Sequence, residues 1–327
     1  GNYNVVVGDE AGTAITTGDG NVLLGFNAGD AVTTGTNNVA IGYAALSTED
    51  AHGSNVAIGR QALENQNAGA EAYNVAIGSL AGNDITTGVS NTIIGGLAGD
   101  AITTAANNTA VGYSSLGANT TGAGNVAIGR LAGAANTTAG SNTFVGERAG
   151  LANTTGDESV AVGQFSYSSN TTGVDNVAVG RSALAANTTA HNNVAIGRAA
   201  LTANTTGSEN TAVGTSALAA NTTADSNTAV GFKSLLVNTT GTANTGLGES
   251  TLRANTTASN NTAVGFSALT ANTTGANNTA VGREAMIANT TGASNAAFGG
   301  VALDANTTGD FNTAVGQGSM SSNTTAD

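Results

Sequence analysis

The sequence contains no cysteine, proline or tryptophan, and it has few charged or aromatic residues. Of its 327 residues, 8 are basic, 21 are acidic and 4% are aromatic, and the formal net charge is -13. The lack of cysteine excludes disulfides and thiolate metal sites, and the shortage of basic residues argues against nucleic-acid binding. No apolar run approaches the roughly 18 residues of a membrane helix, so we expect no membrane insertion of this segment.

Small residues are abundant instead, and they are arranged in a repeat. The motif Asn-Thr-Ala-Val-Gly, as at 278–282, returns with small changes every 17 residues from Asn4 onward, with one 19-residue interval between Asn55 and Asn74, giving 19 copies. We number each copy from position 1, this Asn, to position 17. Position 1 is Asn in 18 of the 19 copies, position 4 is always Val, Ile, Leu or Phe, and position 5 is always Gly. Such a period predicts stacked repeats.

The residues of the repeat predict strands. A 17-residue unit is too short for a pair of helices. β-Branched or small residues at positions 2 to 4 end at Gly, and a Thr-Thr run at positions 13 and 14 ends at Gly or Ala, which predicts two short strands per copy. We therefore predict an all-β parallel β-solenoid (β-roll) of about 19 coils with a small-residue core. The continuous period predicts a single domain over 1–327, as a segment of a longer fibre protein.

Alternation along the first strand places positions 2 and 4 on one face and positions 1, 3 and 5 on the other. Since positions 2 and 4 carry the larger β-branched residues, we expect them to point into the coil and position 3 to point outward. A strand that is apolar on both faces is usually covered on both, so this surface should pack against another copy. The outward apolar face would include Ala110, Ala127, Ala178, Ala195, Ala212, Ala263 and Ala280.

Positions 9 and 12 exchange apolar volume. The copies with Leu184, Leu201 and Leu218 at position 9 carry Asn at position 12, as at Leu201 and Asn204. Two copies with Gly at position 9, at Gly133 and Gly150, depart from the trend because Asn follows at position 12. Because a large apolar residue occurs at position 9 or at position 12 but not at both, we predict that the two side chains share the same interior space. The copies that follow the trend pair Gly12 with Ile15, Gly29 with Val32, Gly82 with Ile85 and Gly99 with Ile102.

Position 12 begins an Asn-Thr-Thr triplet in many copies. Stacked Asn side chains can form a hydrogen-bonded ladder along a solenoid, but each triplet is also a formal glycosylation acceptor. Only one threonine of each pair should face outward, which disfavours the wide flat array needed to bind ice. The candidate glycosylation sites are Asn119, Asn136, Asn153, Asn170, Asn187, Asn204, Asn221, Asn238, Asn255, Asn272, Asn289, Asn306 and Asn323.

Position 6, after the constant Gly, holds the larger side chains and predicts a ridge at a corner of the coil. Scattered arginines and aromatics are typical of contact surfaces, so the ridge is a candidate partner contact, although plain surface side chains explain it equally well. Its members are Tyr43, Arg60, Tyr113, Arg130, Arg181, Arg198, Phe232, Phe266 and Arg283.

The repeat is irregular at about 49–73, where acidic residues and His52 collect. This stretch predicts a bulging loop or, alternatively, a local binding feature.

Nothing in the sequence predicts catalysis or a cofactor. The two histidines, His52 and His191, lie far apart in the chain, and the adjacent carboxylates of Asp157 and Glu158 are expected in a solvated turn. The Gly-Gly-x-Gly-x-Asp motif of calcium-binding β-rolls is absent, as is a phosphate-binding glycine motif between a strand and a helix. We therefore expect a protein that is not an enzyme and that holds no metal or cofactor.

Two stretches, 55–59 with Ala62 and 159–163, resemble the head repeat of YadA-like trimeric autotransporter adhesins. The motif Asn-Thr-Ala-Val-Gly with Ala-Leu and Asn-Thr-Thr-Gly resembles repeats of bacterial and phage tail-fibre-type surface proteins. The resemblance implies a parallel β-roll in an extracellular or cell-surface fibre. Together with the repeat, it leads us to expect a structural rod that associates with other copies, laterally or end to end. The alternative is an adhesin or receptor-binding module for a host glycan or protein.

Overall fold

The computed structural model describes residues 1–326 and contains, within that range, 19 strands and no helix. Each strand is three residues long and occupies positions 2 to 4 of one copy. The chain divides into two compact units, Gly1–Gln164 and Phe165–Asp327, each of which is described by itself below. The single-domain prediction stays a prediction.

Unit 1 contains ten of the strands. They are β1 (Val5–Val7), β2 (Val22–Leu24), β3 (Val39–Ile41), β4 (Val56–Ile58), β5 (Val75–Ile77), β6 (Thr92–Ile94), β7 (Thr109–Val111), β8 (Val126–Ile128), β9 (Thr143–Val145) and β10 (Val160–Val162).

Unit 2 contains the other nine. They are β11 (Val177–Val179), β12 (Val194–Ile196), β13 (Thr211–Val213), β14 (Thr228–Val230), β15 (Thr245–Leu247), β16 (Thr262–Val264), β17 (Thr279–Val281), β18 (Ala296–Phe298) and β19 (Thr313–Val315).

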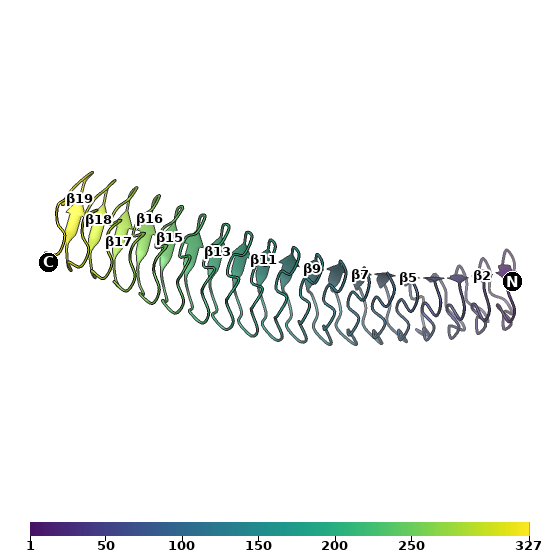
Figure 1. Ribbon diagram of the computed structural model, residues 1–327. Helices are drawn as coiled ribbons and strands as arrows, with labels where there is room; N and C mark the ends of the chain where they lie inside the picture. The colour runs from purple at the N-terminus through teal and green to yellow at the C-terminus, as the bar shows by residue number, and fades with distance from the viewer. Residues whose placement is uncertain (327) are drawn as a thin grey trace. The chain divides into compact units, whose positions relative to one another are not determined.

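Within each unit, every strand pairs in parallel with the next strand along the chain, and equal positions of the repeat lie opposite one another (Figure 1). The register survives the two inserted residues, because Val56 still pairs with Val75. The insertion is therefore absorbed outside the strands, as the predicted loop requires. Each unit is a stack of parallel coils, which confirms the β-solenoid. At about 4.8 Å between strands, unit 1 is roughly 45 Å long.

The Thr-Thr run does not form the predicted second strand, so that prediction was wrong. The amides of Thr205 and Thr206 both donate to the carbonyl of Thr222 in the next coil, at 2.8 and 3.3 Å. In a strand, successive amides point to opposite sides, whereas here the backbone turns and both amides point to the same neighbour. The Thr-Thr backbone therefore still forms hydrogen bonds to the next coil, although it does not have the geometry of a strand.

The constant Gly of position 5 is required both by its backbone angle and by the close approach of the next coil. In Gly214, φ is +135°, a region that is open almost only to glycine. A Cβ atom on Gly214 would lie 2.6 Å from the carbonyl oxygen of Gly231. The chain leaves every strand through this turn, which explains why no other residue occurs there.

The strand faces are the reverse of those predicted. Position 3 points into the coil, and positions 2 and 4 point outward; in β13, Ala212 is fully buried while Thr211 and Val213 are only half-buried. The predicted alternation was correct, but its direction was not, because the interior is too narrow for two β-branched columns. The residues assigned to an outward apolar face are all fully buried: Ala110, Ala127, Ala178, Ala195, Ala212, Ala263 and Ala280.

Interior volume is shared among positions 3, 9 and 12. A Cβ atom on Gly99 would lie 2.8 Å from Cδ1 of Ile102, so the isoleucine fills the space that glycine leaves, as the trade between positions 9 and 12 predicts. The two copies that depart from this pattern, with Gly133 and Gly150 at position 9 and Asn at position 12, are also explained by interior volume. A Cβ atom on Gly133 or Gly150 would lie 2.7 or 2.5 Å from the ring of Phe144, which enters from position 3.

The Asn of position 1 links neighbouring coils through a buried ladder. The Oδ1 atom of Asn193 accepts the backbone amide of Asn210 at 3.0 Å, and its Nδ2 atom donates to the carbonyl of Gly207 at 3.0 Å. Asn193 is fully buried. One side chain thus satisfies groups in two coils, which is the requirement for burying an amide.

The Asn of position 12 forms a second ladder, which confirms the predicted alternative to glycosylation. The Nδ2 atom of Asn204 donates to Oδ1 of Asn187 at 3.2 Å and to the carbonyl of Gly207 at 2.8 Å. Its Oδ1 atom accepts from Nδ2 of Asn221 at 2.9 Å. All these side chains are fully buried, so the amides replace the apolar residues that fill position 12 at Ile85 and Ile102.

Replacing Gly214 by alanine should destabilise the protein. The substitution forces a Cβ atom against the Gly231 carbonyl at a positive φ angle, which costs about 1–3 kcal/mol. The control is Gly300→Ala, where the nearest atom to the new Cβ is the carbonyl oxygen of Arg283 at 4.0 Å; its effect should stay within about 1 kcal/mol. Thermal unfolding followed by circular dichroism measures both, and equal midpoints would contradict this account of the turn.

Replacing Asn204 by aspartate should destabilise the protein more strongly. The new carboxylate oxygen would face two acceptors, Oδ1 of Asn187 and the Gly207 carbonyl, and an unpaired buried charge costs about 3–5 kcal/mol. Asn260→Asp makes the same chemical change at an exposed position 17 and should leave the urea midpoint nearly unchanged. An Asn204→Asp protein as stable as the Asn260→Asp control would contradict the ladder.

Candidate interaction surface

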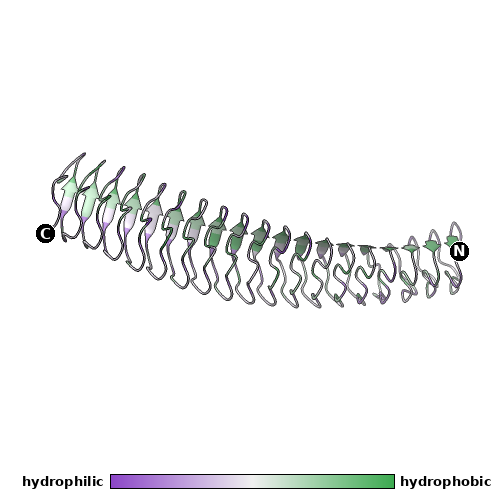
Figure 2. Ribbon diagram, in the orientation of Figure 1, coloured by the Kyte–Doolittle hydropathy of each residue, from purple (hydrophilic) through white to green (hydrophobic). Residues whose placement is uncertain are grey.

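The outward strand face of each unit consists of two columns, positions 2 and 4, and we call it the strand face. It carries only Val, Ile, Leu, Phe, Ala and Thr, without a single charged residue in the 19 copies. Position 4 is the more accessible column, with exposed members at Leu24, Ile77, Ile128, Ile196, Leu247 and Phe298. In Figure 2 the strand next to the C-terminus, β19, turns from purple at the tail to green toward the head.

The two units differ at position 2. Unit 1 has valine in most coils, as at Val39 and Val56, whereas unit 2 has threonine from β13 to β17. The methyl groups of threonine keep this column partly apolar, and its hydroxyl adds a hydrogen-bonding group. Parallel sheets usually have both faces covered, so an uncharged, uncovered face of this length is a candidate interaction surface.

The sequence analysis assigned a contact role to position 3 and therefore missed positions 2 and 4. A signal for the correct assignment was present. Large residues occupy position 3 only beside Gly at position 9 in the same or a neighbouring copy, as for Leu23 with Gly29 and Ile93 with Gly99. A side chain whose size is compensated by position 9 must share the interior with it.

The ridge at position 6 lies on the surface as predicted, and all nine of its named members are exposed. Side chains one coil apart lie against each other: the rings of Phe26 and Tyr43 stack at 5.6 Å between centroids. Nη2 of Arg130 lies 2.7 Å from Oε1 of Glu147 in the next coil. These contacts satisfy part of the ridge within the chain, and the predicted contact with a partner stays a prediction.

Two ridge arginines in unit 2 differ from this pattern. Arg181 and Arg198 occupy position 6 of consecutive coils, and no hydrogen bond or ion pair joins either side chain to another described residue. With Ser182 and Ala199 they line a shallow cavity of about 130 Å³. Two like charges one coil apart repel each other, so the pair favours an anionic group between them.

The candidate glycosylation sites are largely inaccessible, and that prediction was wrong for twelve of the thirteen. The side chains of Asn119, Asn136, Asn153, Asn170, Asn187, Asn204, Asn221, Asn238, Asn255, Asn272, Asn289 and Asn306 are fully buried in the ladder. The amide nitrogen of Asn204 donates both of its hydrogens inside the stack, to Oδ1 of Asn187 in the preceding coil and to the Gly207 carbonyl, so a glycan has neither a free hydrogen to replace nor space to occupy. Only Asn323 is half-buried, and its Nδ2 atom donates to the carbonyl of Ala326 at 3.2 Å.

The paired threonines are divided between interior contacts and solvent, as predicted. At position 13 the hydroxyl donates to the next coil, as from Oγ1 of Thr205 to the carbonyl of Thr222 at 3.0 Å. At position 14 the side chain is exposed, as in Thr274 and Thr291. The exposed threonines form a continuous column along unit 2, whereas Ala51 and Ala68 interrupt the column in unit 1.

Titratable side chains gather at one place in the described chain. Within residues 1–326, the one group that could hold a metal ion is Glu49, Asp50 and His52, at the irregular coils of unit 1. Burial raises the pKa of the Glu49 carboxyl, and the His52 amide and imidazole oppose that rise. Burial likewise raises the pKa of Asp30 and of Asp100.

The two histidines belong to different units, His52 to unit 1 and His191 to unit 2. Asp157, one of the adjacent carboxylates, has Oδ1 2.7 Å from the Gly140 amide and accepts its hydrogen bond. It therefore supports the coil stack from the turn in which it was expected. Among residues 1–326 there is no helix of the length and apolarity that a bilayer crossing demands.

Comparison with protein-family models, with curated proteins and with solved structures finds no match for this chain. The β-solenoid fold is therefore assigned from the parallel strand pairing and the stacked coils of this structure alone.

Proposed function

We propose that this protein is a structural element that assembles with further copies of itself through the strand face. The observation that carries the proposal is the uncharged surface formed by positions 2 and 4. Three residues of about 3.3 Å and a strand spacing of about 4.8 Å give roughly 50 Å² per strand, or about 500 Å² for ten strands. Patches of about 300–600 Å² are the largest on typical monomers and are often functional.

A second copy is the occupant that fits this surface best. Its side-chain columns have the same coil spacing, so contacts made by one coil can be repeated by every coil along a unit. Interdigitated columns of identical side chains form dry and stable interfaces between sheets. We propose that the assembly works outside the cell or at the cell surface, on the basis of the motif's resemblance to adhesin-head and tail-fibre repeats.

Lysines on the strand face should abolish this association. The variant Thr92→Lys, Thr109→Lys, Thr262→Lys, Thr279→Lys adds two charges to the face of each unit. The matched control, Thr104→Lys, Thr121→Lys, Thr274→Lys, Thr291→Lys, changes the exposed position 14 of the same four coils. Sedimentation velocity at several concentrations should show oligomers for the unmodified chain and the control, and monomers for the strand-face variant.

Two results would contradict the proposal. The unmodified chain could sediment as a monomer at about 100 µM, a concentration well above a dissociation constant of about 1 µM, which is typical of a moderate interaction. Alternatively, oligomers or filaments could survive all four strand-face lysines, which would point to end-to-end stacking.

The cavity between Arg181 and Arg198 favours a second candidate function, recognition of an acidic glycan or protein. Arginine binds carboxylate and sulfate oxygens through paired hydrogen bonds, and two guanidinium groups on consecutive coils can hold one anion together. This candidate is the adhesin alternative, now confined to one cavity of unit 2.

Loss of the two arginines tests this alternative. Arg181→Ala with Arg198→Ala should reduce binding to sialylated or sulfated probes on a glycan array by at least about tenfold, since hydrogen bonds to charged groups contribute about 1.5–3 kcal/mol each. Arg60→Ala with Arg253→Ala removes the same charge from separate exposed sites and should leave binding intact. If both variants lose the same amount of glycan binding, the loss reflects overall charge, and the proposed site between Arg181 and Arg198 is contradicted.

A further inference from the structure

The irregular coils of unit 1 contain a buried carboxylate at a position that is apolar in the preceding coil and glutamine in the next. Glu49 occupies position 12, the column that holds Val32 in the preceding coil and Ile85 two coils later. The Glu49 side chain is fully buried. A buried carboxylate is costly unless a charge and hydrogen bonds compensate it, so the groups around Glu49 decide whether this coil is stable.

The carboxylate of Glu49 is only partly satisfied. Its Oε1 atom accepts a hydrogen bond from the backbone amide of His52 at 3.1 Å. Its Oε2 atom is buried and makes no hydrogen bond of full geometry with a described residue, although the Ala68 backbone acts on the carboxyl and lowers its pKa. Nδ1 of His52 is likewise buried without a hydrogen-bond partner among the described residues. Buried polar atoms without partners are rare in folded proteins, and an unplaced ion or water is one of their ordinary explanations.

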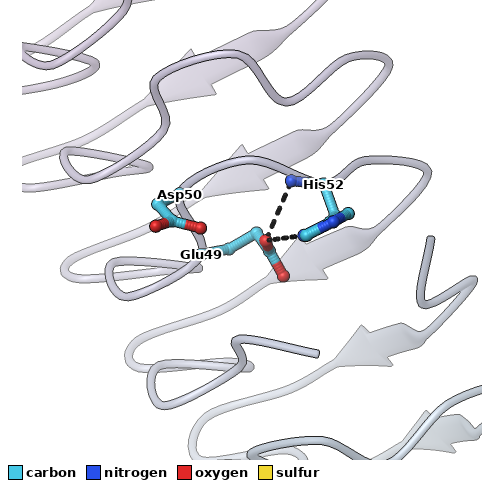
Figure 3. A group of neighbouring side chains, drawn as sticks. All are labelled: Glu49, Asp50 and His52. Carbon is cyan, nitrogen blue, oxygen red and sulfur yellow. Dashed lines mark hydrogen bonds and ion pairs between the residues drawn. The ribbon is translucent and has the colours of Figure 1, made fainter. Parts of the chain in front are cut away.

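The separation of the two side chains suits a shared metal ion. Oε1 of Glu49 and Nδ1 of His52 lie 3.6 Å apart, which is too far for a hydrogen bond. With metal–ligand distances of about 2.1 Å, two ligands of a tetrahedral site lie roughly 3.4 Å apart. Figure 3 shows the carboxylate of Glu49 turned toward the ring of His52.

Asp50 supplies a third ligand. One of its carboxylate oxygens belongs to a set of ligand atoms, with Glu49 and His52, that all lie within 4.8 Å of one another. Asp50 is exposed, so its side chain can rotate toward an ion, and a solvent molecule can complete the coordination from the same side.

The backbone that carries the three ligands is held by neighbouring coils. The carbonyl of Asp50 accepts from the amide of Thr33 at 2.6 Å and from its hydroxyl at 2.8 Å. The carbonyl of His52 accepts from Nδ2 of Asn38 at 3.1 Å. The segment therefore stays in place whether or not an ion is bound, which favours binding because little order has to be gained.

We propose that Glu49, Asp50 and His52 bind one divalent transition-metal ion, with Zn²⁺ as the best fit. Imidazole nitrogen selects zinc and its neighbours over Mg²⁺ and Ca²⁺, which require more oxygen ligands than this segment supplies. The ion neutralises the buried carboxylate and lies between that carboxylate and Nδ1 of His52. It stabilises the coils at the place where the repeat is interrupted, independently of assembly through the strand face.

The competing explanation is a metal-free ion pair between a protonated His52 and Glu49. Both explanations use the same two side chains, but they differ in how removal of the carboxylate charge acts. Glu49→Gln should keep the fold, since Gln66 occupies position 12 of the next coil. If the ion pair is correct, this variant loses thermal stability whether or not zinc is present.

Titration of the whole chain with ZnCl₂ by calorimetry, after treatment with chelator, tests the proposal. We expect one equivalent to bind, and we expect Co²⁺ to give the visible absorption of a tetrahedral nitrogen and oxygen site. Glu49→Gln and His52→Gln should each weaken binding by more than about tenfold, since even a residue that only orients a ligand contributes about 10- to 100-fold. The control His191→Gln should bind as the unmodified chain does.

Thermal unfolding provides the second measurement. Zn²⁺ should raise the unfolding midpoint of the unmodified chain and of His191→Gln, but not that of Glu49→Gln. The proposal is overturned if the unmodified chain binds Zn²⁺ no more tightly than Glu49→Gln, or if His191→Gln removes the binding.

Discussion

The structure depends on hydrogen bonding between each coil and the next. Many of the polar groups that are buried in one coil find a partner in an adjacent coil, because the narrow interior offers few partners within the coil itself. Two asparagine columns meet this requirement: the amide of Asn204 bonds to its counterparts in the preceding and following coils. A buried polar column is stable only when every member is satisfied, and identical residues in register achieve this without further design.

The same constraint determines the glycines and the small interior. Coils stacked at strand spacing leave no room for a Cβ atom at position 5, where the next carbonyl would lie 2.6 Å away from it at Gly214. Interior space is equally limited, so a large residue at position 3 is accompanied by glycine at position 9. Phe144 beside Gly133 and Gly150 shows that this compensation reaches across neighbouring coils. The interior is therefore packed separately in each coil, and a large side chain is compensated only by a small one in the same or a neighbouring coil.

The larger β-branched residues of the strand are consequently left outside. In most globular proteins they would form the core, but here Ala212 fills the interior and Thr211 and Val213 face outward. An uncharged outer face with regular spacing is the structural consequence of a thin interior. The irregular coils are the opposite case: the position-1 ladder continues through Asn55 and Asn74, but at position 12 Glu49 is buried with fewer hydrogen-bond partners than the asparagines have.

The sequence by itself determined the parallel β-solenoid, its period, the glycine turn, the asparagine ladder and the exchange between Gly99 and Ile102. Each follows from local chemistry repeated at a fixed interval, so one copy contains all the information. Only the tertiary structure decided which strand face is inside, that the Thr-Thr run bends instead of pairing as a strand, and that Asn204 is closed to glycans. Alternation fixes which residues share a face but not which face closes on itself. That choice depends on the interior volume of the whole coil, to which positions 3, 9 and 12 contribute together.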